Sequence, residues 1–370
     1  MLRPSLHPRH RLVFVLAVLL TACQPKAIPM TPEEQQRIEA LTANMTTRCV
    51  GRYLVDMPER FVLSSESTTV IEGVKVAVRP MDERLFEMSL KGRHAELQRE
   101  KIIGRDIPSL LSAMEIKGQQ GLAFNRSRSR ESAMLRTLEV FAWKDGYYLN
   151  LQVDAQDVSL AYKKFANDTR TTDTPEKLAH LLKIFDRVSG RKDTEVPTAP
   201  GLCIPNGFVA GAERKGQETD AVYHLVDAPD VWFGFGSSDA IKEKTTLFDR
   251  TPDVERAMKD GGSKTLRKDK RTLHGQTYEE WLFINTPEQD DVRGSNFLMH
   301  GNELRTDPAQ PFIEFKLHNG NRIPVPDLTM VEKDRLGLFK PLPKATLSDA
   351  EALAIWDKVS ATLRPRPRAF

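Results

Sequence analysis

Cys23 is the residue whose neighbours most clearly specify a chemistry. It ends the segment Leu20-Thr21-Ala22-Cys23, which follows an unbroken apolar run over residues 12–20 and a basic start with three arginines. This order of regions is that of a secretory signal peptide, and its apolar part is too short to span a bilayer. The four residues match a lipobox, in which the cysteine sulfur is lipidated after residues 1–22 are removed. We therefore expect Cys23 to anchor the mature chain to a membrane.

The residue after this cysteine predicts which membrane holds the anchor. Gln24 stands there and not Asp, so the usual sorting pattern places the anchor in the outer membrane, with the body facing the periplasm. An ordinary signal peptide with an incidental cysteine, or a core helix, is the alternative. No second long apolar segment follows, so we expect a soluble, tethered body.

Cys49 and Cys203 are the two remaining cysteines. After export they would face an oxidising compartment, where disulfides form and persist. A bridge between them would close a loop of roughly 150 residues, worth about 4–5 kcal/mol in the chain-entropy model. The alternative is a pair of buried free thiols, because unpaired cysteine is common in protein cores.

Motifs for catalysis or cofactor binding do not occur in complete form. There is no Gly-x-Ser-x-Gly elbow and no His-Glu-x-x-His zinc helix. Residues 211–216 have the glycine spacing of a phosphate loop, but Gln217 and Glu218 replace the required Lys and Ser or Thr. The histidines are scattered, and no pair has metal-ligand spacing. We therefore predict no enzyme activity, no metal and no cofactor, while noting that triad residues need not be close in sequence.

Two basic runs are candidates for contact with a partner. They supply Arg126, Arg128 and Arg130 in the first half, and Lys268, Lys270 and Arg271 in the second. Solvated charges that protect a strand edge are the simpler interpretation, and a steering patch for an acidic protein is the alternative. Removing residues 1–22 takes away three of the 54 basic residues and leaves them equal in number to the 51 acidic ones. This balance argues against nucleic acid as a partner.

The first half of the chain predicts helices around a meander of strands. Thr31-Pro32-Glu33-Glu34 combines an N-cap, a proline at the first helical position and a capping-box glutamate, which predicts a helix to about residue 44. An Asp145-Gly146 pair between alternating segments predicts a hairpin. The other predicted elements are a strand over 70–78, a helix over 82–102 with Leu85, Phe86, Met88, Leu90 and Leu97 inward, strands over 121–130, 133–143 and 147–153, a short helix over 158–165, and a helix from 174 through Val188 to Gly190.

A charged, proline-rich stretch over 191–201 predicts a linker to the second half. Strands are predicted over 221–226, 231–236, 264–273, 276–285, 295–300 and 312–318, with a helix over 252–259 and a proline-punctuated excursion over 319–344. The capping box Ser348-Asp349-Ala350-Glu351 opens a final helix to about Leu363.

The two halves end alike, in Phe185-Asp186-Arg187-Val188-Ser189 and Trp356-Asp357-Lys358-Val359-Ser360. Each pentapeptide closes the same order of cysteine, meander and helix, although chance similarity is the alternative. The sequence therefore predicts an α+β protein of two tandem related domains, each a mainly antiparallel sheet with packed helices, after a signal peptide and a short tether helix. The predicted divisions are a signal peptide 1–22, an anchor and tether helix 23–48, an N-terminal domain 49–190, a linker 191–201, a C-terminal domain 202–363 and a tail 364–370.

The decapeptide Cys-Val-Gly-Arg-Tyr-Leu-Val-Asp-Met-Pro at 49–58, after a lipoprotein leader, resembles the start of the immunity lipoproteins paired with type VI secretion phospholipase effectors. The two-half layout is similar to that family over about residues 45–362. The resemblance implies a periplasmic antitoxin, monomeric apart from its effector, whose two domains grip a lipase and block substrate access. An outer-membrane assembly or scaffold lipoprotein, and a lipid- or peptidoglycan-modifying enzyme, are the alternatives.

Overall fold

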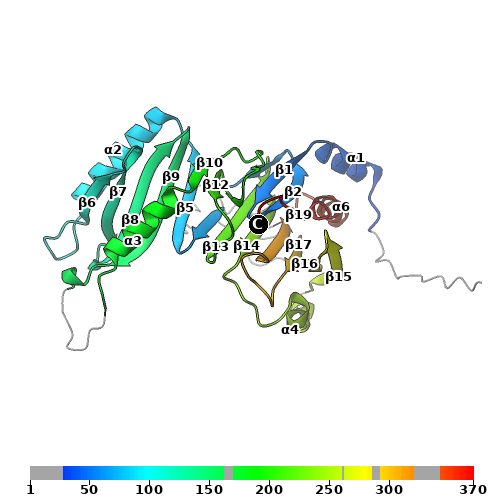
Figure 1. The fold of residues 1–370 in the computed structure, drawn as a ribbon. Coiled ribbons are helices and arrows are strands. Elements are labelled where there is room, and N and C mark those ends of the chain that lie inside the picture. The colour runs from blue at the N-terminus through cyan, green and yellow to red at the C-terminus, as the bar shows by residue number, and fades with distance from the viewer. Residues whose placement is uncertain (1–27, 162–169, 261, 286–291, 321–341) are drawn as a thin grey trace, which may run out of the picture.

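A single antiparallel sheet of thirteen strands crosses the molecule (Figure 1). The computed structural model describes residues 28–161, 170–260, 262–285, 292–320 and 342–370. The predicted signal peptide with Cys23, and most of the predicted excursion over 319–344, lie outside the described residues. No helix among the described residues is long and apolar enough to cross a membrane.

Each half of the sheet repeats one topology. A hairpin lies at the centre of the sheet, a helix follows it, and a four-strand meander returns until its last strand pairs with the second arm of the hairpin. A closing helix then ends the half. This repeated order confirms the predicted pair of tandem α+β domains. The first half has β4 (Thr68–Ile71), β5 (Val74–Pro80), α2 (Glu83–Arg99), β6 (Leu110–Glu115), β7 (Gln120–Ser129), β8 (Ser132–Lys144), β9 (Tyr147–Gln156) and α3 (Thr174–Phe185). The second half has β13 (Gln217–Leu225), β14 (Ala228–Ser238), α4 (Leu247–Asp260), β15 (Lys264–Leu273), β16 (Gln276–Asn285), β17 (Gly294–Gly301), β18 (Phe312–Asn319) and α6 (Asp349–Ser360).

The two halves join where β4 pairs with β13, in register from Thr68 opposite Asp220 to Ile71 opposite Gln217. A short strand, β3 (Phe61–Leu63), also pairs with β13. The pairing continues the ladder from one half into the other, so the two domains share their backbone hydrogen bonds.

Two small sheets show that the halves exchange strands. The hairpin of β1 (Met45–Val50) and β2 (Tyr53–Pro58) is completed by β19 (Arg364–Pro365) from the end of the chain. The hairpin of β11 (Gly201–Ile204) and β12 (Gly207–Ala210) is completed by β10 (Val188–Gly190), which follows α3. Each half's last strand therefore completes the other half's opening hairpin.

The cores follow the same exchange. Val55 and Met57 of β2 are fully buried in the core of the second half, together with Trp356 of α6. Leu202 of β11 and Val209 of β12 are buried in the core of the first half. The opening decapeptide, which we expected to begin the body of the first domain, thus packs on the second, because apolar side chains alternate along β2 toward that core.

Helices cover the two faces of the sheet unequally. The helices α3 and α6 pack over the face that carries both cores, and α1 (Pro32–Leu41) lies beside α6 (Figure 1), where Arg37 Nε is 2.7 Å from Glu351 Oε1. On the opposite face, α2 packs against β7 and β8, and α4 against β15 and β16. Between α2 and α4, no described helix covers the middle of this second face, which we call the open face.

Several sequence predictions are confirmed. The strands over 264–273 and 276–285 have the predicted bounds, and the other four predicted strands of the second half lie within the observed ones or within one residue of them. Asp145 and Gly146 form the turn between β8 and β9, with φ of 51° and 85°. Both capping boxes form as predicted, at Thr31 and at Ser348.

Other predictions are wrong for identifiable reasons. The strand over 70–78 is a hairpin, because Glu72 and Gly73 adopt φ of 51° and 83° and turn the chain. Leu85 and Met88 are 58% and 62% exposed, since α2 touches the sheet only along a narrow stripe through Phe86.

The ends of several elements also differ from the prediction. The helix through Val188 ends at Phe185, and Val188 begins β10. The helix over 252–259 begins at Leu247, with Pro252 inside it, and the final helix ends at Ser360. Only a 3-10 turn, Val158–Leu160, occupies the described part of 158–165.

The predicted linker and tail are packed parts of the fold. Arg191 is 3% exposed, and its guanidinium donates to the carbonyls of Gly207, Lys192 and Cys49, among others. At the end of β19, the side chain of Arg366 is buried in the same way and donates to carbonyls in the linker, those of Pro197, Ala199 and Gly201. A charged side chain buried against carbonyl oxygens has no hydropathy signature, so composition suggested loose segments.

Candidate interaction surface

The first basic run is divided between the interior and the surface. Arg126 is mostly buried, with Nε 2.6 Å from Glu139 Oε2. Arg128 is half exposed, 3.3 Å from Asp154 Oδ2, and Arg130 is exposed. The buried Glu139 also receives Arg93 of α2 at 3.0 Å, and these two cations hold its pKa below its usual value although burial acts to raise it. Glu139 therefore links α2 to the sheet through Arg93, and Arg126 shares its carboxylate.

The second basic run lies on the outer edge strand at the other end of the sheet. Lys270 is 61% exposed and pairs with Glu279 at 3.0 Å, and Lys268 lies over the ring of Phe248 in α4. Arg271 is mostly buried, 2.8 Å from the fully buried carboxylate of Glu280. Because β7 and β15 lie at opposite ends of the sheet, the two runs do not form one patch.

The structure joins Cys49 to Cys203 by a disulfide with an S–S distance of 2.04 Å. Both residues are buried, with Leu54 and Phe208 around them. The bond links β1 to β11 beside an antiparallel bridge in which Gly51 and Cys203 exchange two backbone hydrogen bonds of 2.8 Å. It therefore fastens the two exchanged hairpins to each other.

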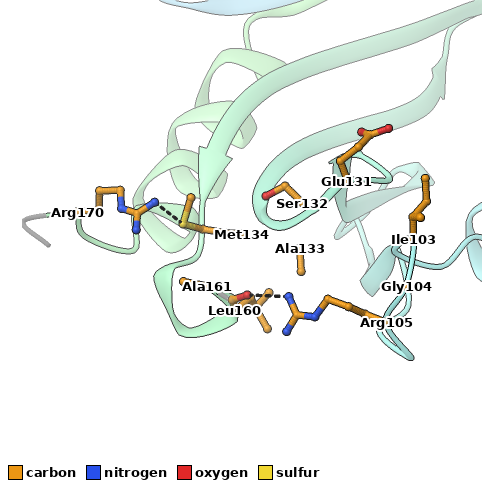
Figure 2. Close-up of a pocket in the computed structure, with 10 residues that line it drawn as sticks. All are labelled: Ile103, Gly104, Arg105, Glu131, Ser132, Ala133, Met134, Leu160, Ala161 and Arg170. Atoms are coloured by element: carbon orange, nitrogen blue, oxygen red, sulfur yellow. Dashed lines mark hydrogen bonds between the residues drawn. The ribbon is translucent and has the colours of Figure 1, made fainter. Parts of the chain in front are cut away.

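A pocket of about 600 Å³ lies at the tip of the first half, where the turn between β7 and β8 meets the 3-10 turn (Figure 2). Figure 2 shows Arg105 donating to the carbonyl of Leu160 at 3.5 Å and Arg170 to the sulfur of Met134 at 3.2 Å. Among the described residues of the lining, Glu131 supplies a carboxylate. The described lining presents cationic and apolar groups suited to protein contact.

The open face carries a partly buried charge cluster at its centre. Asp220 of β13 and Glu314 of β18 flank Gly236 of β14 in register, and they line a cavity of about 240 Å³. Burial raises the pKa of Asp220. Burial also acts to raise the pKa of Glu314, but the His300 hydrogen bond and the Lys316 ammonium, 2.8 Å away, lower it to about 2.

Sequence reasoning missed this cluster, although one signal marks it. Gly234 and Gly236 are separated by one residue in β14. A glycine inside a strand often marks a place where another group approaches the backbone closely. A Cβ at Gly234 would lie 2.6 Å from the side chain of Lys316. The glycine therefore leaves the space in which the Lys316 side chain lies across β14 and reaches Glu314.

The cavity at the centre of the open face is where the carboxylates of this surface come together. Among the described residues, no group of three or more His, Cys, Asp or Glu side chains could hold a metal ion. Asp220 and Glu314 have pKa values shifted in opposite directions, and among the described residues that line their cavity the other titratable group is Glu218. These carboxylates can accept hydrogen bonds from the donors of a partner.

Two family models match consecutive parts of the chain. The model described as the Tle cognate immunity protein 4 N-terminal domain matches residues 46–191, and the corresponding C-terminal domain model matches residues 195–368. Together they include every strand of the thirteen-stranded sheet. No curated protein matches the chain.

Solved structures share the fold. "The crystal structure of Tle4-Tli4 complex" contains a chain that is 18% identical with a TM-score of 0.65, over 88% of this chain and 98% of that one. The apo immunity protein TplEi of T6SS from Pseudomonas aeruginosa is also 18% identical, with a TM-score of 0.64 over 87% and 97%. The same protein complexed with an "L" peptide has a TM-score of 0.59.

Proposed function

This chain belongs to the Tle cognate immunity protein 4 family, and from this premise we propose that it is an immunity protein that binds and inhibits a type VI secretion phospholipase effector. The observation that carries the proposal is the match of both family domains over the whole sheet. In this proposal the chain blocks the path of substrate to the lipase and performs no chemistry itself.

The open face is the surface that best suits this inhibitor. It lies between α2 and α4, and α2 presents the exposed apolar side chains of Leu85 and Met88. Its centre presents the carboxylates of Asp220 and Glu314 in a cavity. Exposed apolar side chains and partly desolvated charges are both typical of protein interfaces.

We also propose that the mature chain is tethered to the outer membrane through lipid on Cys23 and faces the periplasm. The lipobox-like leader and the buried disulfide support this location, because disulfides persist in an oxidising compartment. A tether on the membrane that the lipase attacks would raise the local concentration of the inhibitor.

Co-expression with a type VI secretion phospholipase effector tests the function. Cells that export the lipase should survive with the full-length chain, and the two purified proteins should form a stoichiometric complex. Equal killing with and without the chain would refute the immunity function, and a stable envelope complex lacking any lipase would favour a scaffold.

A matched pair of charge reversals tests the surface. Glu218→Lys reverses a charge in the lining of the central cavity. It is expected to weaken the complex about tenfold, because an effector bound at the open face would meet a positive charge where the wild type has a negative one. Lys183→Glu, exposed on α3 over the opposite face, is the control and should bind as wild type does. Loss of affinity in the control alone would place the effector on the helix-covered face.

A further inference from the structure

The two halves differ at one position of their shared topology. In the second half, the hairpin arms β13 and β14 pair along their whole length, from Glu218 opposite Ser238 to Leu225 opposite Ala228. In the first half, β4 and β5 pair only at Val70–Lys75 and Ile71–Val74. The rest of the first arm follows β13, because β3 pairs with it and Ser64 donates to the carbonyl of Val222 at 2.7 Å. The first hairpin is therefore splayed open.

A slot of about 310 Å³ lies between the splayed arms. Residues from 63–69 line one wall, residues 76–80 line the other, and Pro205 and Asn206 stand at one end. The strand β4 contributes residues both to the slot, through Thr69, and to the central cavity of the open face, through Thr68 and Val70.

The wall formed by β5 presents backbone groups without a partner strand. The amide of Met81 donates to Gly146 on the β9 side, and backbone groups alternate sides along a strand, so the N–H and C=O groups of Val76 and Val78 point into the slot. Among the described residues, no backbone hydrogen bond or strand pairing reaches these groups on that side. Unpaired edge groups of this kind are a template for strand addition.

We propose that an extended segment of the phospholipase effector adds to β5 in this slot and pairs with the backbone of Val76 and Val78. The proposal rests on the proposed function and deepens it. The second half supports this occupant, because there the full-length pairing of β13 fills the corresponding place beside β14. Main-chain hydrogen bonds would supply affinity, and the small slot, with Ser64, Ser65 and Ser67 on its wall, would admit short or polar side chains.

Amide hydrogen exchange of the intact chain tests the pairing directly. Saturation with the purified phospholipase should slow exchange at Val76 and Val78 by at least tenfold. A saturated complex in which both amides exchange as in the free chain would overturn this inference and leave the proposed function intact. If the chain and the phospholipase form no complex, both this inference and the proposed function are refuted. Protection that rises with the concentration of the chain alone would overturn it in favour of a second copy as occupant.

A proline scan of strand edges provides the second test. Val78→Pro removes an N–H that faces the slot, and it should weaken effector binding at least tenfold. Thr272→Pro is the matched control, because Thr272 lies on the outer edge of β15 with its N–H directed away from β16, and its binding should stay within twofold of wild type. Equal affinity of the folded Val78→Pro variant and the control would overturn the inference.

Discussion

Opening the Cys49–Cys203 bond should lower the free energy of unfolding by about 5 kcal/mol. The bond spans 154 residues, and the chain-entropy model gives a value of this size at 25 °C for a loop of that length. Domains of this kind have total stabilities of about 5–15 kcal/mol, so the loss is a large fraction of the total. Because the loop contains the whole first half of the sheet, its closure restricts that part of the unfolded chain.

The measurement is guanidinium unfolding of the oxidised chain, the reduced chain and the Cys49→Ala/Cys203→Ala variant. Both cysteines are no more than 1% exposed, so reduction must be carried out in denaturant before refolding. The reduced chain keeps both side chains and isolates the effect of the loop, whereas the double variant adds the loss of packing against Leu54 and Phe208. A reduced chain within 1 kcal/mol of the oxidised one would refute the loop argument.

Three further predictions concern buried charge, pH and the anchor. Glu280→Ala should cost about 3–5 kcal/mol in urea unfolding, because it leaves Arg267 and Arg271 without their buried partner, whereas Lys270→Ala, which removes a solvent-exposed ammonium, should cost no more than about 1 kcal/mol. Burial lowers the pKa of His318 to about 4, below its unfolded value of 6.5, so stability is present above pH 6.5 and falls as the pH drops toward 4. The wild type should lose about 2 kcal/mol more than His318→Phe between pH 7 and 5, and an equal loss would contradict this assignment. Cys23→Ala should move the chain out of the membrane fraction on cell fractionation, and retention there would exclude the lipid anchor.

Local patterns predicted those parts of the fold that local sequence determines. Alternation over 264–273 and 276–285 predicted β15 and β16, because one face of each strand packs on a core. Capping residues fixed the starts of α1 and α6. The repeat was predicted by aligning the pentapeptides that begin at Phe185 and Trp356, which would make Gly190 equivalent to residue 361. The strand register makes Gly190 equivalent to Pro365, because Gly190 lies opposite Gly207 and Pro365 lies opposite Tyr53. The two alignments of the halves therefore differ by four residues.

Long-range pairing could not be predicted in the same way. The strand β19 pairs with β2, whose residues are more than 150 positions away in the sequence. A local hydrophobic period cannot indicate such a distant partner strand. The open face was missed because its charges come from three separate strands, with Asp220, Glu314 and His300 each unremarkable in sequence. Only the glycines of β14 signalled the close packing there.

The exchanged strands predict that the two halves cannot fold separately. A fragment over 46–191 would lack β11 and β12, which supply Leu202, Ile204 and Val209 to its core, and would expose β1 and β2 without the core they cover. We therefore expect this fragment alone to be unfolded by circular dichroism and urea titration, and the intact chain to unfold in one transition.

The two fragments 28–194 and 195–370, produced together, should associate and restore that transition, because the described core contacts and the Cys49–Cys203 bond remain available across the cut. A fragment over 46–191 that folds by itself with a cooperative transition would show that the exchange is dispensable. In the intact chain, the β4–β13 pairing, the Cys49–Cys203 bond and the buried guanidinium of Arg191 join the two halves, which indicates a rigid body that meets its effector preformed.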